Sequence, residues 1–160
     1  LDDIDVAAHF GVRSPPGPWT SHEILRVPER LLAHRDYLAQ RGTPSSLEEL
    51  GGHELFAWEA PGDDPVRLPL LAGGAFTVEP TLITTDIHMI RQCVIAGQGI
   101  GFLPDAMFPD PGVAPEELVP VLPTVVGRER GVRVVIPTAL AEVPKVKAVL
   151  QHVRAFTGEL

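Results

Sequence analysis

The chain has 160 residues, 44% of them hydrophobic, which is enough to bury a core in one domain or in two small lobes. Its formal net charge of −8, with no run of Lys or Arg, argues against nucleic-acid binding by this segment, because phosphate contacts need a basic surface. No apolar run approaches the roughly 20 residues of a membrane-spanning helix.

The chain has one cysteine, Cys93, so no intrachain disulfide can form and a reducing, cytoplasmic compartment is expected. Cys93 falls on the apolar face of a predicted helix. We interpret it as a small buried side chain in preference to a redox sensor.

The first predicted element is a strand over residues 4–10. This segment is almost entirely apolar, as expected for a strand that is covered on both faces of an α/β sheet. Residues 13–18 are rich in Pro and Gly and exclude a helix or a central strand. The chain is therefore expected to leave one lobe here.

Two extended pieces are predicted next, over residues 23–27 and 30–34, with Pro28 interrupting them. A short helix over residues 36–41 follows and stops at a glycine. Residues 45–52 begin with a capping box, in which a Ser and a Glu are three residues apart, and predict a second helix that ends at a Gly pair.

The middle of the chain predicts a strand and then a hairpin. Large apolar side chains occupy both faces of residues 53–59, which indicates a buried strand. Residues 60–65 combine Pro, Gly and Asp and predict a loop. Residues 67–71 and 76–79, separated by a Gly pair, predict the two strands of a hairpin.

Residues 82–104 are the most informative segment and predict a complete strand, helix and strand. Thr85 and Asp86 carry short oxygen-bearing side chains that suit a helix N-cap, and apolar residues then repeat at helical spacing. The helix is expected to stop at Gly97. Residues 100–103 then predict a buried parallel-type strand, which a proline ends.

The last part of the chain begins with a loop, rich in Pro and Gly, through residue 115. Residues 132–136 are mostly β-branched and predict a strand that makes the second crossing between lobes. Apolar residues at helical spacing over 143–153 predict an amphipathic terminal helix. Strands that alternate with helices in this way predict a doubly wound α/β architecture.

The order of these motifs closely resembles the effector-binding domain of LysR-type transcriptional regulators. The most specific part is residues 86–104, where an acidic residue opens a helix that leads into Ala-Gly-x-Gly-Ile-Gly-x-Leu-Pro. Asp36 departs from the pattern, because it stands where the family usually has Pro. Further segments that match in the same order are 1–11, 28–44, 47–53, 118–123 and a final helix from about Pro144.

The resemblance implies an α/β, type 2 periplasmic-binding-protein-like two-lobed fold, with one lobe nearly complete and the other partial. Residues 17–133 would form the second lobe. Residues 1–16 would be part of the first lobe, and residues 134–160 would return to it through the C-terminal helix. The family's N-terminal helix-turn-helix has no counterpart here, so a DNA-binding domain is expected to be absent from this chain.

Ligands of open α/β sheets bind beyond the carboxyl ends of strands and against helix N-termini, and two such places can be named. One is the turn before the helix of residues 87–96. The other is the end of the first strand, which the resemblance places on the opposite lip of a cleft. The predicted ligand-binding residues are His9, Phe10, Gly11, Trp58, Glu59, Thr84, Thr85, Asp86 and Phe102.

Each of these residues also has a purely structural interpretation. Thr85 and Asp86 can cap their helix without touching a ligand. His9 can have a neutral structural role, and Trp58 is more often a core residue than a cleft residue.

No catalytic, cofactor or metal site is predicted. The six histidines lack the paired spacing of a zinc site, and neither a nucleophile elbow nor a phosphate-binding loop is present. The glycines at 97–101 follow a helix and precede a strand, which is the reverse of a dinucleotide fingerprint. We therefore expect a binding protein with no enzyme activity and no cofactor.

The resemblance implies that the chain senses a small-molecule effector, an organic acid or another metabolite. Such a ligand would bind between the lobes and alter the geometry of a homo-oligomer, a dimer or a tetramer, in the parent protein. DNA would be a partner only through the absent helix-turn-helix, and no membrane partner is expected. The alternative is a solute-binding protein of a transporter with the same fold; an enzyme on this fold would need an acid-base pair at the cleft.

Overall fold

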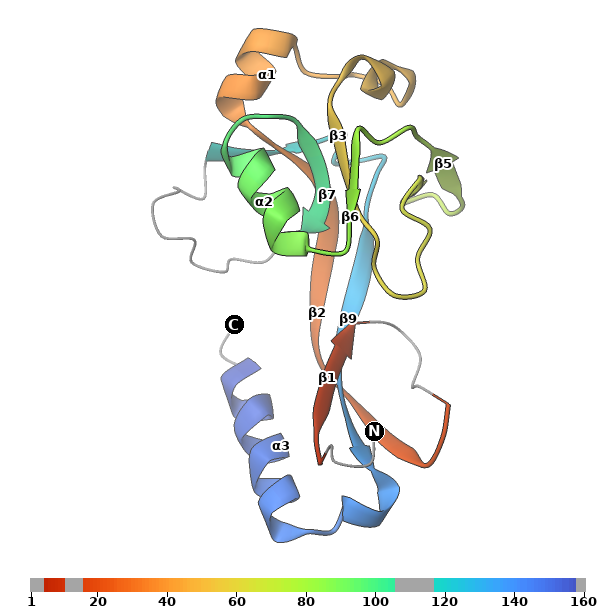
Figure 1. The fold of residues 1–160 in the computed structure, drawn as a ribbon, viewed down its shortest axis with the longest axis vertical. Helices are drawn as coiled ribbons and strands as arrows, with labels where there is room; N and C mark the ends of the chain where they lie inside the picture. The colour runs from red at the N-terminus through yellow and green to blue at the C-terminus, as the bar shows by residue number, and fades with distance from the viewer. Residues whose placement is uncertain (1–4, 11–15, 106–116, 158–160) are drawn as a thin grey trace. The chain divides into compact units, whose positions relative to one another are not determined.

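The computed structural model describes residues 5–10, 16–105 and 117–157 (Figure 1). The chain divides into two compact units: unit 1 is Leu1–Val27 with Glu129–Leu160, and unit 2 is Pro28–Arg128. Two long strands, β2 (Trp19–His34) and β9 (Arg128–Pro137), have residues in both units. The predicted lobe boundaries stay a prediction. Within the described ranges, no helix is long and apolar enough to cross a membrane.

Unit 2 is built on a mixed sheet in the order β2, β7 (Ile100–Pro104), β3 (Leu55–Trp58), β6 (Leu82–Thr84). Strand β7 is parallel to β3 but antiparallel to β2, so the predicted parallel-type strand has one neighbour of each kind. β3 and β6 are parallel, and helix α2 (Ile87–Ile95) makes the connection from β6 to β7. β8 (Leu118–Val121) pairs with the end of β2.

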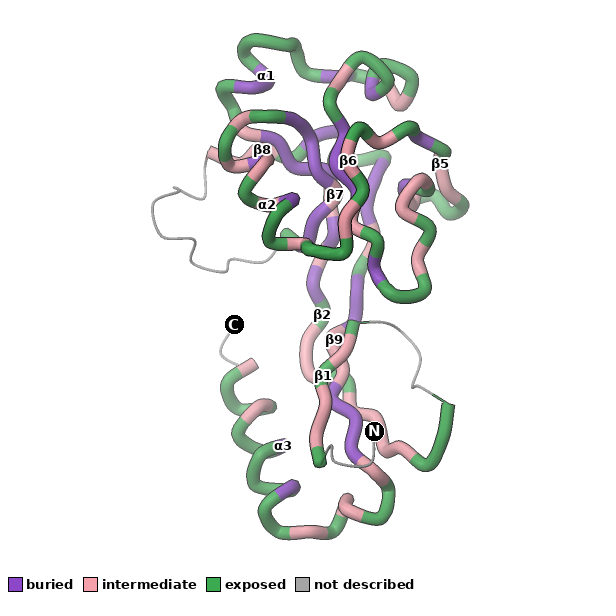
Figure 2. Tube along the Cα trace, in the orientation of Figure 1, coloured by how far each residue is buried: buried purple, intermediate pink, exposed green. Residues whose placement is uncertain are grey.

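The two faces of this sheet carry separate apolar clusters, as the period of two along a strand requires. Leu32 and Phe56 pack with α2 on one face, whereas Leu31 and Leu55 belong to the cluster on the other face. Figure 2 shows the buried residues along β3 and β7 and the exposed outer side of α2. The second face is covered by α1 (Arg35–Arg41), η1 (Glu48–Gly52), and the hairpin of β4 (Arg67–Pro69) and β5 (Ala75–Thr77).

The prediction that Pro28 interrupts the chain between two extended pieces is wrong, because β2 runs through it. The pairing of β2 with β7 begins at Glu29, so Pro28 lies outside that ladder and its missing N–H removes none of the ladder's hydrogen bonds. Its carbonyl accepts a hydrogen bond from the Asp105 backbone N at 2.7 Å.

The helix predicted at residues 45–52 is a short 3₁₀ helix, η1. Two serines, Ser45 and Ser46, make the hydrogen bonds at its N-terminus. The Glu49 carboxylate accepts from the Ser45 backbone N at 2.7 Å, and Ser46 Oγ accepts from the Glu49 backbone N at 3.4 Å. The Ser45 backbone N–H, followed by the Ser45 hydroxyl, stabilises the charged carboxylate and lowers the pKa of Glu49. A single turn satisfies the capping pattern, so the pattern did not require a longer helix.

Unit 1 contains β1 (Ala7–Phe10), which pairs antiparallel with β9, and helix α3 (Pro144–Thr157). The predicted terminal helix is therefore present. Its apolar face buries Val146 and Leu150 in a cluster with Val134 and Ile136 of β9. A short 3₁₀ turn, η3 (Thr138–Leu140), leads from β9 toward this helix.

Two glycines allow the central strand β7 to pack closely in unit 2. A Cβ placed on Gly99 would lie 2.5 Å from the Glu54 carbonyl oxygen and 2.7 Å from the Phe56 ring. A Cβ on Gly101 would lie 2.8 Å from a methyl group of Val94 on α2. Real Cβ atoms do not approach other atoms this closely, so the absence of a side chain is a packing requirement at both positions.

We expect Gly99→Ala to lower the free energy of unfolding by about 2 kcal/mol, because the added methyl group must displace a backbone carbonyl and a buried ring. Gly51→Ala is the matched control, since a Cβ there meets nothing within 4 Å. Urea denaturation of the two variants measures the difference. Equal stabilities would contradict the close approach of β7 to residues 54–56.

Candidate functional site

The turn before α2 is organised by the chain's own oxygen atoms. Asp86 has an extended backbone (φ −92°, ψ 99°), and its Oδ1 accepts from the backbone N of His88 at 2.9 Å and of Met89 at 3.2 Å. Thr84 Oγ1 accepts from the Asp86 backbone N at 3.1 Å. Asp86 is thus the N-cap, and the hydroxyl that braces it belongs to Thr84 and not to Thr85. Because a carboxylate already uses two N–H groups, this helix start is not vacant for an anion.

Trp58 and Glu59, at the end of β3, are tied to the same turn. Trp58 Nε1 donates to the Thr85 carbonyl at 3.1 Å, and the Glu59 backbone N donates to the Thr84 carbonyl at 2.9 Å. The parallel register pairs Trp58 with Thr84. The structure therefore brings together the residues predicted at the carboxyl ends of these two strands and at the start of α2. Thr85, Asp86 and Glu59 are exposed there, whereas Trp58 is half-buried.

A cavity of about 360 Å³ lies next to this turn, entirely within unit 2. Trp58 and Phe102, both predicted ligand residues, line it, whereas Thr84, Thr85 and Asp86 do not. Its volume is within the range of small-molecule sites, roughly 300–1,000 Å³. The charged residues that line it are Asp63, Asp64, Arg67 and Arg128.

Arg128 is the principal polar group of this cavity, and it is paired on two sides. Its Nε donates to Glu29 Oε2 at 2.6 Å, and its Nη2 donates to Asp63 Oδ2. The guanidinium carbon lies 5.7 Å from the centroid of the Phe102 ring, in cation–π range. Burial acts to lower the pKa of Arg128, but the bonds and charges of Glu29 and Asp63 outweigh it and raise the pKa, so the group stays cationic.

Sequence reasoning missed Arg128, Glu29 and Asp63 as site residues. Glu29 and Arg128 are 99 positions apart, and Asp63 lies in a segment that was interpreted only as a loop. The local signals were a Glu at the interruption between the two predicted extended pieces and an Arg shortly before the strand predicted over residues 132–136. Neither signal identifies a partner so distant in sequence.

The predicted residues of the first strand lie in unit 1. His9 is half-buried on β1; its Nδ1 donates to the Phe10 carbonyl at 3.1 Å, and its buried Nε2 has no hydrogen-bond partner among the described residues. Phe10 is 41% exposed. Gly11 lies outside the described residues.

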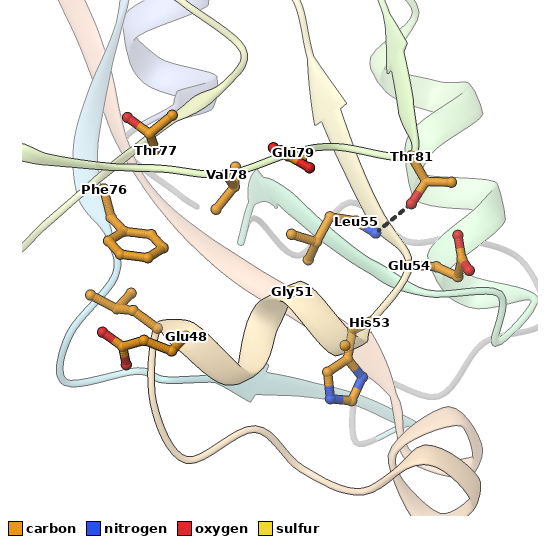
Figure 3. Close-up of a pocket in the computed structure, with 12 residues that line it drawn as sticks. Glu48, Gly51, His53, Glu54, Leu55, Phe76, Thr77, Val78, Glu79 and Thr81 are labelled. Carbon is orange, nitrogen blue, oxygen red and sulfur yellow. Dashed lines mark hydrogen bonds between the residues drawn. The ribbon is translucent and has the colours of Figure 1, made fainter.

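A second hollow of about 470 Å³ lies in unit 2 between η1 and the segment that contains β5 (Figure 3). Leu55 N donates to Thr81 Oγ1 at 3.3 Å along its wall. Its lining includes Glu48, Glu54 and Glu79 but no Lys or Arg, so it repels an organic acid. None of the predicted ligand residues lines it. The smaller cavity at Arg128 is the better candidate for an anionic ligand.

The described part of the chain contains no group of three or more His, Cys, Asp or Glu that could hold a metal ion. At the Arg128 cavity, the side chains present can contact a ligand in two ways. Two aromatic rings offer flat apolar surface, and a guanidinium supplies a donor to an anion.

The family model of the LysR substrate binding domain matches residues 1–158. The chain belongs to this family. The HTH-type transcriptional regulator CrgA of Neisseria meningitidis serogroup C (strain 8013) is 30% identical over 120 residues, which are 74% of this chain and 40% of that protein. The CrgA of a serogroup B strain has the same identity and coverage. The chain thus spans less than half the length of these curated relatives.

Solved structures show the same fold. The regulatory domain of CrgA superposes with a TM-score of 0.82 at 22% identity, covering 98% of this chain and 76% of that one. The regulatory domain of an AphB variant (C227S) from Vibrio vulnificus gives 0.75 at 20% identity, covering 98% and 76%. The effector domain of AmpR from Pseudomonas aeruginosa gives 0.72 at 18%, covering 98% and 74%. The α/β, periplasmic-binding-protein-like fold class predicted from sequence is confirmed.

We expect Asp86→Ala to lower the free energy of unfolding by about 1 kcal/mol, because two backbone N–H groups of α2 lose their side-chain acceptor. Asp86→Asn keeps an oxygen at that place and should lose only a fraction of this. Urea denaturation of both variants is the measurement. If both variants lose the same amount, the carboxylate charge stabilises the helix start, and the hydrogen bonds do not.

Proposed function

We propose that this chain is the effector-sensing part of a LysR-type transcriptional regulator, which binds a small organic acid or related metabolite and catalyses no reaction. The observation that carries the proposal is the family match over residues 1–158, together with regulators as the full-length relatives. Those relatives favour regulation over the rival function of a transporter's solute-binding protein.

In unit 2, the ligand contacts would come from the Arg128 cavity and the adjoining turn. Trp58 and Phe102 would supply the apolar walls, and Glu59 and residues 84–86 would border the opening from the neighbouring strand ends. His9 and Phe10 of β1 remain proposed ligand residues, as does Gly11, which follows them in the sequence. The evidence that supports Trp58 and Phe102 is their common position in the cavity with a guanidinium.

The ligand would act by mass action. It can shift a conformational equilibrium only by binding two arrangements of the protein with different affinity. In the parent protein, a cytoplasmic homo-oligomer, this shift would change how the attached helix-turn-helix domains sit on DNA. The acidic chain itself would not touch DNA.

This acidic chain, purified alone, should not bind duplex DNA specifically, because it has a net charge of −8 and its described residues contain no helix-turn-helix. Gel mobility shift with promoter DNA is the measurement, and the whole regulator is the positive control. A sequence-specific shift that survives increased salt would contradict this part of the proposal.

A pair of threonine variants separates ligand contact from helix capping. We propose that Thr85 contacts the effector at the opening of the cavity, so Thr85→Val should weaken effector binding by about 1–2 kcal/mol. It should cost little stability, because the Thr85 hydroxyl does not brace the cap. Thr84→Val removes the acceptor of the Asp86 backbone N and should mainly lower stability. The measurements are ligand titration and urea denaturation.

The threonine pair should be made in the intact regulator, with its ligand found by thermal-shift screening of small organic acids. If a folded Thr85→Val protein binds that ligand as tightly as the original, Thr85 is not part of the site. If no small molecule stabilises the intact regulator and none changes its DNA binding, effector sensing itself is wrong.

A further inference from the structure

We propose that Asp63 occupies the place of the ligand's anionic group on Arg128, so that the cavity admits an aromatic carboxylate only when that carboxylate displaces Asp63. The inference rests on the proposed function and adds a ligand class and a specificity-determining residue to it. A ligand then binds only if its affinity for Arg128 exceeds that of the Asp63 carboxylate.

The two carboxylates on Arg128 differ in how easily they can be exchanged. The Glu29 side chain is 1% exposed, and Arg128 Nε is bound to it at 2.6 Å. The Asp63 side chain is 26% exposed and binds Nη2, and both Asp63 and Arg128 line the cavity, whereas Glu29 does not. Moving Glu29 would leave an uncompensated charge in the core, whereas Asp63 can exchange Arg128 for water. Asp63 is therefore the partner that a ligand can replace.

The chain segment that carries Asp63 is suited to such a movement. Asp63 belongs to the turns between β3 and β4, where its backbone N donates to the Ala60 carbonyl at 3.0 Å. Gly62 precedes it with φ +84°, a conformation that glycine adopts without strain. No ladder of strand bonds fixes this position, so the side chain can withdraw without disrupting the sheet.

The cavity also restricts the rest of the ligand. Trp58 and Phe102 line it, and Phe102 lies under the guanidinium that the anion would bind. A flat ring attached directly to a carboxylate can contact these aromatic faces while its oxygens reach Arg128. A simple anion such as acetate lacks the ring contacts that would offset the loss of the Asp63 bond. We infer a small aromatic carboxylate as the ligand class.

The test compares benzoate with benzamide, which has nearly the same shape but no charge. Ligand-observed NMR titration is done on the intact regulator and on its D63N and D64N variants, after circular dichroism has confirmed that each is folded. D63N should bind benzoate about tenfold more tightly than the original, because the neutral amide competes less well for a guanidinium. Benzamide binding should not tighten.

D64N is the matched control, because it removes the same charge from the neighbouring position. Asp64 accepts from the Val66 backbone N at 3.2 Å and makes no contact with Arg128 in the described interactions. It should give only a fraction of the D63N gain. If D64N gained as much affinity for benzoate as D63N, the gain would come from the change in net charge alone, and the proposal would be overturned. The proposal is also overturned if D63N binds benzoate no more tightly than the original protein. This includes the case in which neither protein binds benzoate.

Two further variants distinguish failure of this inference from failure of the proposed site. W58A and F102A should weaken benzoate binding if the cavity is the ligand site. If they weaken binding while D63N does not tighten it, the site stands and Asp63 is not a competitor. If benzoate binds and W58A, F102A and D63N all leave its affinity unchanged, the cavity is not the ligand site. Both the proposed assignment of the site and this inference are then wrong.

Discussion

The packing of β7 in the middle of the unit 2 sheet is the constraint on which the rest of this unit depends. β7 is buried between apolar clusters on both faces, and it joins the antiparallel pairing with β2 to the parallel pairing with β3. Glycines at 99 and 101 let residues 54–56 and α2 approach its backbone. This close packing fixes the register of β3 and β6, and the register places the ends of these strands beside the start of α2.

A second consequence of this sheet is a buried charge at its margin. Glu29 precedes the apolar end of β2 and is almost completely removed from water, which costs free energy unless the carboxylate is paired. Arg128, the first residue of β9, pairs with it and extends to Asp63 and over the Phe102 ring. One guanidinium thus serves both the stability of the sheet and the polarity of the cavity.

This double role is relevant to how a sensing domain can work. If a ligand displaces Asp63, it binds a guanidinium that also pairs with the buried Glu29, so ligand binding and the stability of the sheet share one side chain. The start of α2 is different, because Asp86 satisfies its N–H groups and adds a negative charge there. An anionic ligand is therefore better served by the guanidinium than by the helix dipole in this protein.

The sequence by itself determined most of the elements and the family. Patterns of period two and 3.6, with Gly, Pro and Asp at the boundaries, predicted β3, the hairpin, α2, β7 and α3, because these signals depend on residues close together in the chain. It failed at Pro28, where the ladder partner decides whether a missing N–H matters, and at η1, where a single turn satisfied the capping pattern.

Only the tertiary structure decided the polar groups of the cavity. Trp58 and Phe102 could be named from their strands, but Arg128, Glu29 and Asp63 acquire their meaning from one another across large separations in sequence. Composition counts such charges as solvated surface, the usual state of charged residues. Burial of Glu29 reverses that expectation, because a carboxylate without water requires a cation that only the folded chain can bring to it.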